Sequence, residues 1–96
     1  MDLPAGQEAA RRCGINLLAQ CKAAVGDLSR IKQVVKLGGF VNSHPLFTSI
    51  PQVINGCSDL MVDVFEEKGR HARSAVACPT LPLGVAVEID GVFEIA

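Results

Sequence analysis

The chain of 96 residues is 49% hydrophobic and 20% charged, and it has a formal net charge of −1 and a pI of about 6.0. This charge provides no field of one sign to attract a polyanion, and the chain has no Trp or Tyr to stack on bases, so nucleic acid is not expected as a partner. The length predicts one domain over residues 1–96. Its mean hydropathy of +0.33 is high, and we expect an oligomer to bury part of the apolar surface.

The amino-terminal segment and the cysteines both favour the cytoplasm. Residues 1–12 lack the apolar core of a secretion signal, and no run of residues is long and apolar enough to span a membrane. The four cysteines form no Cys-x-x-Cys pair and lack the histidine spacing of a zinc site. We therefore expect a cytoplasmic protein with free thiols at Cys13, Cys21, Cys57 and Cys78, and no metal or other cofactor.

The first predicted element is a helix over residues 4–25, which Asp2 is predicted to cap and Gly26 and Asp27 to end. Small and apolar residues recur along one face at spacings of three and four. They are Ala10, Cys13, Gly14, Leu17, Cys21, Ala24 and Val25. Because these side chains are short, the helix can lie close to a sheet.

A strand is predicted next, over residues 31–41, from its content of Val and Ile. Gly38 and Gly39 within it predict a bulge or a close contact with its backbone. They do not indicate a phosphate-binding loop, because no Gly-Lys-Ser or Gly-Lys-Thr follows them.

A second helix is predicted to begin at Ser49, which has the spacing of a capping box with Gln52. Gly69 is predicted to end this region in a left-handed conformation. The predicted buried stripe consists of Val53, Cys57, Leu60, Met61, Val64 and Phe65.

Two more strands, over residues 72–78 and 84–95, complete the chain, and the turn residues between them favour a hairpin. The element order predicts an α+β fold with two helices packed on one face of a sheet. Three such strands leave one apolar face and long edges uncovered. We expect a subunit interface, or a strand from another chain, to cover them.

Arg73 and Glu88 are the two residues that we expect to bind a substrate and act on it. In an antiparallel hairpin, Arg73 would lie within a position or two of Glu88. An arginine can hold a carboxylate in a bidentate fork, and a nearby carboxylate can handle water or a proton, so the pair could recognise a small keto or imino acid. The alternative is a cross-strand salt bridge on a solvated sheet face.

Several other residues have both a functional and a structural interpretation. His71 could be a general base or an anion ligand beside Arg70 and Arg73, or a surface residue. Asn55 stands in the middle of a predicted helix, where Asn is a poor helix former, so its side chain is either used or tolerated. His44 has less to support a role, and the cysteines are expected to behave as small hydrophobes.

Four stretches together resemble the Rid family of YjgF-type reactive intermediate deaminases, also called endoribonuclease L-PSP or translation-inhibitor proteins. They are VVKLGGFVNSHPLF, QVINGCSDLMVDVF, GRHARSAV and LPLGVAVEIDGVFEI. Each is a modest motif, and their order and spacing carry the resemblance over nearly the whole chain. It implies a chorismate-mutase-like mixed sheet, assembled as a homotrimer with clefts between subunits.

The resemblance also implies a function and a set of site residues. Members of the family hydrolyse enamine and imine acids such as 2-aminoacrylate to 2-keto acids and ammonia. Matching the motifs assigns the carboxylate clamp to Arg73, the acid that positions water to Glu88, and a residue near the cleft to Asn55. Ala75 stands where many deaminases have cysteine, so only its backbone could bind substrate.

One departure from the family concerns the start of the chain. Family members normally have a further β segment before the first helix, so we expect a shortened domain that lacks one wall of the cleft. The predicted function is therefore an enamine/imine deaminase. The alternative is a non-catalytic homo-oligomer of the same family, which binds a keto acid or acts as a scaffold, and a ribonuclease is a third candidate that rests on family names.

Overall fold

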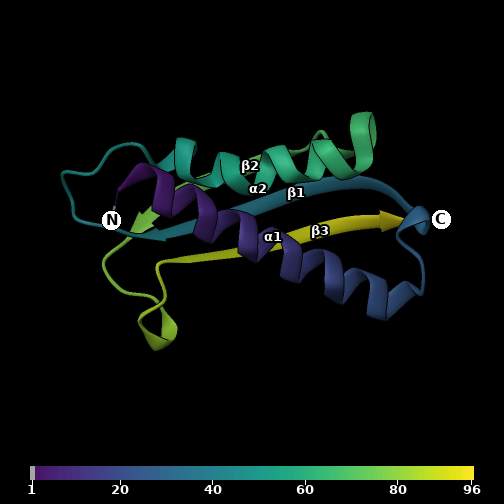
Figure 1. The fold of residues 1–96 in the computed structure, drawn as a ribbon, viewed down its shortest axis with the longest axis horizontal. Helices are drawn as coiled ribbons and strands as arrows, with labels where there is room; N and C mark the ends of the chain where they lie inside the picture. Colours follow the sequence, from purple (N-terminus) through teal and green to yellow (C-terminus); the bar gives the residue numbers. More distant parts are fainter. Residues whose placement is uncertain (1) are drawn as a thin grey trace.

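The structure is a computed structural model, and it describes residues 2–96 as two long helices and three strands (Figure 1). These elements are α1 (Leu3–Val25), β1 (Ile31–Asn42), α2 (Ile50–Phe65), β2 (Ala72–Cys78) and β3 (Val87–Ile95), with 3-10 turns at Leu28–Arg30, Glu66–Gly69 and Pro82–Gly84. Both helices lie on the same side of the sheet, which confirms the predicted α+β class (Figure 1). Neither these helices nor any other in residues 2–96 has the length and apolarity needed to cross a bilayer.

The order of strands in the sheet is β2-β1-β3, so the predicted hairpin between the last two strands is wrong. β1 runs parallel to β2 and antiparallel to β3, which makes it the central strand. A parallel pair requires a long crossover, and α2 supplies it between β1 and β2. Residues 79–86, with the turn at Pro82–Gly84, then carry the chain past β1 to its other side. This connection is longer than the tight turn of a hairpin, so β3 does not have to pair with β2.

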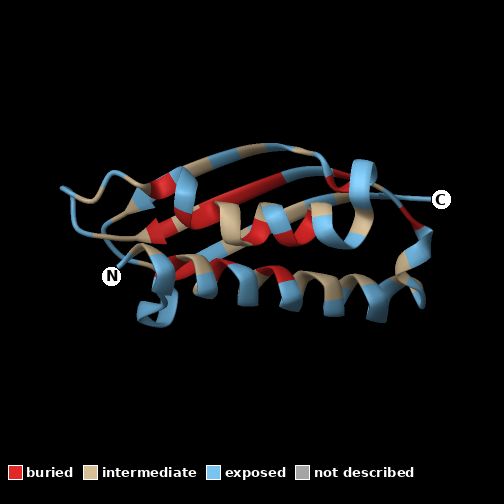
Figure 2. Cartoon of the chain, turned by 45° about the horizontal axis from the view of Figure 1, so that its top comes forward, coloured by how far each residue is buried: buried red, intermediate tan, exposed pale blue. Residues whose placement is uncertain are grey.

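The core lies between β1 and the two helices, where buried residues gather in Figure 2. Its largest fully buried side chains are Ile31, Leu37, Ile54, Met61, Val34, Val41, Val53 and Cys57. A Cβ atom on Gly39 would lie 2.6 Å from the side chain of Ile54, so this glycine lets α2 approach the sheet closely. The bulges of β1 occur earlier, near residues 31–36, and the glycine pair therefore marks the close contact and not the bulge.

The ends of the helices match the predictions only in part. Asp2 caps α1 by accepting a hydrogen bond from the amide of Ala5 (2.8 Å), and Gly26 ends the helix with a φ of 87°. At α2, Ser49 makes no side-chain cap, because its backbone (ψ 42°) does not have the extended conformation that a capping serine needs.

Gly69 does not have the predicted left-handed conformation. The positive φ falls instead on Glu66, directly after α2 (φ 57°, ψ −127°). Gly69 is needed for space, because a Cβ atom there would collide with the backbone carbonyl of Met61. The chain can therefore leave α2 close to the helix and enter β2 beside it.

The sheet face opposite the helices is uncovered within residues 2–96, as predicted, and we call it the open face. Residues on neighbouring strands form rows across it, such as Val76, Phe40 and Glu88. Val35, Val76 and Val92 are 44%, 45% and 57% exposed, which is high for valines in three paired strands. Exposed apolar side chains on an uncovered sheet face are typical of a surface that contacts another chain.

The four cysteines are free thiols, as predicted. Cys57 is fully buried on α2, and this burial, with a smaller contribution from nearby Cys13, raises the pKa of its thiol to about 12. Burial also raises the pKa values of Cys13 and Cys21. Cys57 acts as a small apolar group in the core, and Cys13 packs against it.

The raised pKa of Cys57 predicts that the protein loses stability in alkaline solution. In the unfolded chain the thiol ionises near its ordinary value of 9.0, whereas in the folded chain it stays neutral up to about 12. The unfolded state therefore binds fewer protons between these pH values, and the free energy of unfolding should fall by about 1 kcal/mol between pH 8 and pH 10.

Urea unfolding at several pH values measures this fall, and Cys57→Ala is the control. The variant lacks the buried thiol but keeps Cys13 and Cys21, so its alkaline loss should be smaller than that of the wild type. An equal loss in the two proteins would contradict the assignment to Cys57.

Candidate functional site

Arg73 lies near the start of β2, and its side chain is on the face of the sheet that carries the helices. Its Nη1 donates a hydrogen bond to Ser58 Oγ (3.1 Å), and its Nη2 donates to the carbonyl oxygen of Pro51 (3.2 Å). The residue is half-buried, and no salt bridge to it occurs within residues 2–96. A guanidinium has five N–H donors, so these two bonds leave others that can bind an anion.

Ser58 and His71 extend this contact into a chain of hydrogen bonds. Ser58 Oγ lies 2.9 Å from His71 Nε2, and His71 Nδ1 lies 2.5 Å from the carbonyl oxygen of Gly69. A carbonyl oxygen can only accept, so Nδ1 carries the proton and Nε2 accepts from the Ser58 hydroxyl. The hydroxyl oxygen in turn accepts from Arg73, because a guanidinium can only donate. In this series of hydrogen bonds, the Ser58 hydroxyl, both ring nitrogens of His71 and the Gly69 carbonyl oxygen therefore each have a suitable donor or acceptor.

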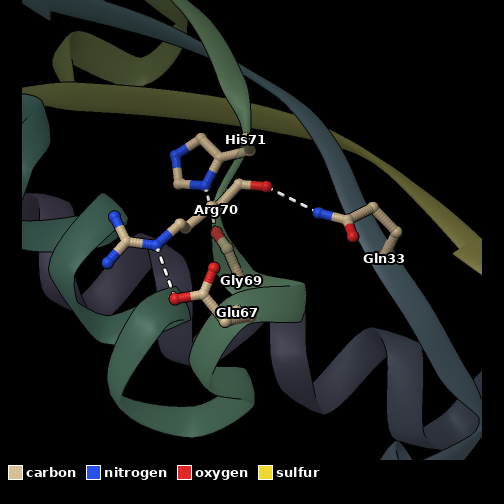
Figure 3. A network of polar contacts seen from close by, with 5 residues as sticks. All are labelled: Gln33, Glu67, Gly69, Arg70 and His71. Carbon is tan, nitrogen blue, oxygen red and sulfur yellow. Dashed lines mark hydrogen bonds and ion pairs between the residues drawn. The ribbon is translucent and has the colours of Figure 1, made fainter.

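The segment before β2 is held in place by its backbone, as Figure 3 shows. The side-chain amide of Gln33 on β1 donates to the carbonyl oxygen of Arg70 (2.6 Å). The guanidinium of Arg70 turns toward Glu67, with its Nε 3.1 Å from the carboxylate (Figure 3). Both members of that pair are exposed, so it adds little to stability, but it gives Arg70 an acidic partner, and Arg73 has none within residues 2–96.

A shallow hollow of about 260 Å³ lies beside these residues. It is lined by Asn55, Ser58, Asp59, Val62, Arg70, His71 and Arg73. Residues 55, 58, 59 and 62 follow the i, i+3, i+4 and i+7 spacing, which places them on one face of α2. Of the residues predicted from the sequence, the structure thus brings together Asn55, His71 and Arg73.

Glu88 does not join them, and its predicted position next to Arg73 is wrong. Arg73 is opposite Leu37 of β1, and Glu88 is opposite Phe40 on the other side of the same strand. The two residues therefore lie at opposite edges of the sheet, and side chains alternate so that Arg73 is on the helix face and Glu88 on the open face. This arrangement also excludes the alternative of an Arg73–Glu88 salt bridge within the chain.

Although its side chain is on the open face, Glu88 is in the edge strand β3 and also borders a hollow of about 430 Å³ between α1 and β3. Cys13, Asn16 and Gln20 of α1 also line this hollow. The carboxylate of Glu88 is near enough to the thiol of Cys13 to add to the effect of burial in raising its pKa. The chain therefore has a cationic hollow at the β2 edge and an anionic residue at the β3 edge.

The sequence model of the "YjgF/chorismate_mutase-like, putative endoribonuclease" family matches residues 2–93. The chain belongs to this family. Its helices and mixed sheet are those of the YjgF chorismate-mutase-like fold, as predicted.

Three proteins are similar to the chain in sequence, and two of them have solved structures. Protein TCP17 of Trypanosoma cruzi is 55% identical over 91 residues, which are 94% of this chain and 57% of that protein. The solved structure of Atu1372, of unknown function, from Agrobacterium tumefaciens is 50% identical with a TM-score of 0.98, over 100% of this chain and 62% of the other. A protein from Shewanella oneidensis MR-1, described as a "putative endoribonuclease", is 37% identical with a TM-score of 0.90, over 93% of this chain and 59% of the other. The chain thus spans about three fifths of the length of these three proteins.

The remaining predicted residues of this YjgF-family chain lie outside the hollow at Arg73. The side chain of Ala75 packs against the core, two positions along β2 from Arg73. His44 is exposed in the loop after β1, where its Nδ1 accepts a hydrogen bond from the amide of Leu46 (3.1 Å), so it supports a local turn.

Ser58 is the residue that sequence reasoning missed. Its signal is its position three residues after Asn55, on the same face of α2. A serine in a helix carries no chemistry until the segment with His71 and Arg73 is placed against it.

Proposed function

We propose that this YjgF-family protein is an enamine/imine deaminase. It takes small reactive acids of the 2-aminoacrylate type and releases the 2-keto acid and ammonia. The observation that carries the proposal is the half-buried Arg73, which is held by Ser58 and Pro51, has no carboxylate partner within residues 2–96, and lies beside Asn55 in a hollow. A fixed guanidinium of this kind suits the carboxylate shared by these acids.

The second part of the proposal is that each site is shared between two copies of the chain. Arg73 lies at one edge of the sheet and Glu88 at the other, so a head-to-tail contact between copies can bring the β3 edge of one to the β2 edge of the next. Asn55 and the backbone of Ala75 then complete the wall on the Arg73 side. Three such contacts close a homotrimer, with Glu88 placed to orient the water.

The open face supports assembly from several copies. Its exposed valines and the half-buried Phe40 would be covered in an oligomer, which also accounts for the high mean hydropathy. Four free thiols fit a reducing compartment, and we place the protein in the cytoplasm on that ground.

Ammonia release tests the activity. An enzyme that generates 2-aminoacrylate is coupled to the protein, and ammonia is followed against a buffer control. We expect faster release with the protein. A folded protein that gives no acceleration over buffer would overturn the assignment as a deaminase.

Mixing two inactive variants tests whether the site is shared. Arg73→Ala and Glu88→Gln each remove one group, and co-expression lets copies of both kinds assemble together. If Arg73 and Glu88 come from different copies, random assembly leaves about one quarter of the sites with both groups intact, so about one quarter of the wild-type activity returns. If no activity returns above the sum of the two variants, the groups act within one chain and the shared site is wrong.

A non-catalytic role in binding a keto acid is the second candidate. It is favoured by the separation of Arg73 from Glu88, the acid that would act on water, because Arg73 alone is enough to bind the carboxylate of a keto acid. Calorimetry with 2-oxobutanoate distinguishes the two, because binding without turnover supports this candidate. Endoribonuclease activity, suggested by the description of the Shewanella relative, is not expected from a net charge of −1, and RNA incubation with an Arg73→Ala control tests it.

A further inference from the structure

We propose that His71 and Ser58 are the proton-transfer pair of the Arg73 site, with Ser58 as the group that faces the substrate and His71 as the base behind it. This inference rests on the proposed function, because it assigns two further residues to the same reaction. It starts from a serine hydroxyl that contacts both an imidazole and the guanidinium expected to hold the substrate.

The contacts have the order that such a pair requires. The carbonyl oxygen of Gly69 accepts from His71 Nδ1, which fixes the ring and leaves Nε2 as an acceptor. The Ser58 hydroxyl donates to Nε2 over 2.9 Å, within the range for proton transfer. This is a hydroxyl, a base and a third group that orients the base, the arrangement found where side chains are activated.

Within one copy of the chain, the surroundings of the pair offer few other groups for this task. Asp59, Arg70 and Arg73 are the charged residues that line the hollow with it, and Arg70 is engaged with Glu67. Asp59 is exposed on α2, and no hydrogen bond joins it to His71 or Arg73 within residues 2–96. Ser58 and His71 are both half-buried, so their contact is partly shielded from water.

The position of Ser58 relates the pair to the reacting carbon. Arg73 Nη1 lies 3.1 Å from Ser58 Oγ, so a carboxylate held by the same guanidinium lies next to the hydroxyl. In a 2-imino acid, the carbon under attack is bonded directly to that carboxylate. A water between this carbon and Ser58 can therefore reach both.

During the reaction, the pair takes one proton from water and later returns it to the amine. The oxygen of water bonds to C2 of the iminium acid, and the C=N electron pair moves to nitrogen. Water gives a proton to Ser58 Oγ as the hydroxyl proton of Ser58 passes to His71 Nε2. The proton then returns through Ser58 to the amine, the C–N bond breaks with its electron pair on nitrogen, and ammonia leaves. The new hydroxyl group loses its proton to the ammonia as the C=O bond of the keto acid forms.

Substitution of His71 tests the pair. For His71→Ala we expect kcat for ammonia release to fall by about 100-fold or more, the usual contribution of a general acid–base group, and the Kd for 2-oxobutanoate to change less than about 3-fold. Added imidazole should restore part of kcat, which it would not do if His71 only supported the fold. Ser58→Ala should lower kcat by about 10-fold or more, and His44→Ala is the matched control that leaves kcat unchanged.

A kcat of His71→Ala within about 3-fold of the wild type would overturn this role and leave the deaminase function standing. Oxygen-18 exchange from water into the ketone of 2-oxobutanoate keeps the two questions separate, because it requires the same attack of water at C2 but no imine. Exchange that the wild type accelerates and His71→Ala does not would support the pair even if no ammonia were released. Exchange that the wild type fails to accelerate, with no ammonia release either, would overturn both.

Discussion

Replacing Arg73 by lysine should lower kcat/KM for ammonia release by about 30- to 100-fold and weaken the binding of 2-oxobutanoate by a similar factor. The reason is geometric, because a lysine ammonium keeps the charge but cannot form the planar fork that holds a carboxylate at two points. Hydrogen bonds to charged groups are worth about 1.5–3 kcal/mol each, and the loss of one such bond accounts for this factor. Steady-state kinetics and calorimetry on the same preparation measure the two effects.

Arg70→Lys is the matched control for this substitution. Arg70 lies three residues away at the margin of the same hollow, but it is exposed and contacts Glu67. Its replacement should change kcat/KM by less than about 3-fold, because an exposed ion pair contributes little. Circular dichroism checks that both variants are folded, since Arg73 also donates to Pro51. Equal effects of the two substitutions would mean that Arg73 has no special role in binding.

The second large effect is expected on stability, for Gly56→Ala in α2. Alanine is normally the better residue in a helix, by about 1 kcal/mol over glycine. At position 56, however, a Cβ atom would collide with the backbone carbonyl of Gln7 on α1, and a backbone cannot move aside without separating the helices. We expect the free energy of unfolding to fall by about 2–3 kcal/mol, as for overpacked cores.

Gly14→Ala distinguishes this collision from a general effect of alanine between the helices. Its Cβ atom would meet the side chains of Leu60 (2.9 Å) and Cys57 (3.0 Å), and side chains can adjust. We expect a change of less than about 1 kcal/mol in urea unfolding, partly offset by helix propensity. If Gly56→Ala were as stable as Gly14→Ala, the backbone contact would not limit the packing of α1 on α2.

The helices, the strands and their class could be predicted because they depend on local periodicity. Residues 4–25 and the stripe of the second helix have a clear spacing, and the valines of residues 31–41 indicate a strand. Pairing of the strands depends instead on how residues 79–86 cross the sheet, which no local pattern records. The hairpin prediction failed for this reason, and with it the placement of Glu88 beside Arg73.

The candidate site could be predicted only where a residue type is informative by itself. Arg73 and His71 stand out in GRHARSAV, and Asn55 stands out as a poor helix former. Ser58 does not, because its importance comes from the three-dimensional contact with His71 and Arg73. The two helix-end predictions that failed, at Ser49 and Gly69, depend on backbone angles that the residue type alone does not fix.

The missing side chain at Gly39 has a consequence for evolution and for protein engineering. It sets the spacing between the sheet and α2 through its contact with Ile54, which lies one helical turn from Ser58. A larger residue at position 39 would force the side chain of Ile54 to shift, and if that side chain cannot turn aside, α2 would move and carry the hydroxyl of Ser58 away from the guanidinium. Catalytic rate could thus be tuned by a substitution that touches neither the substrate nor any polar group, and a search for altered activity should include this buried position.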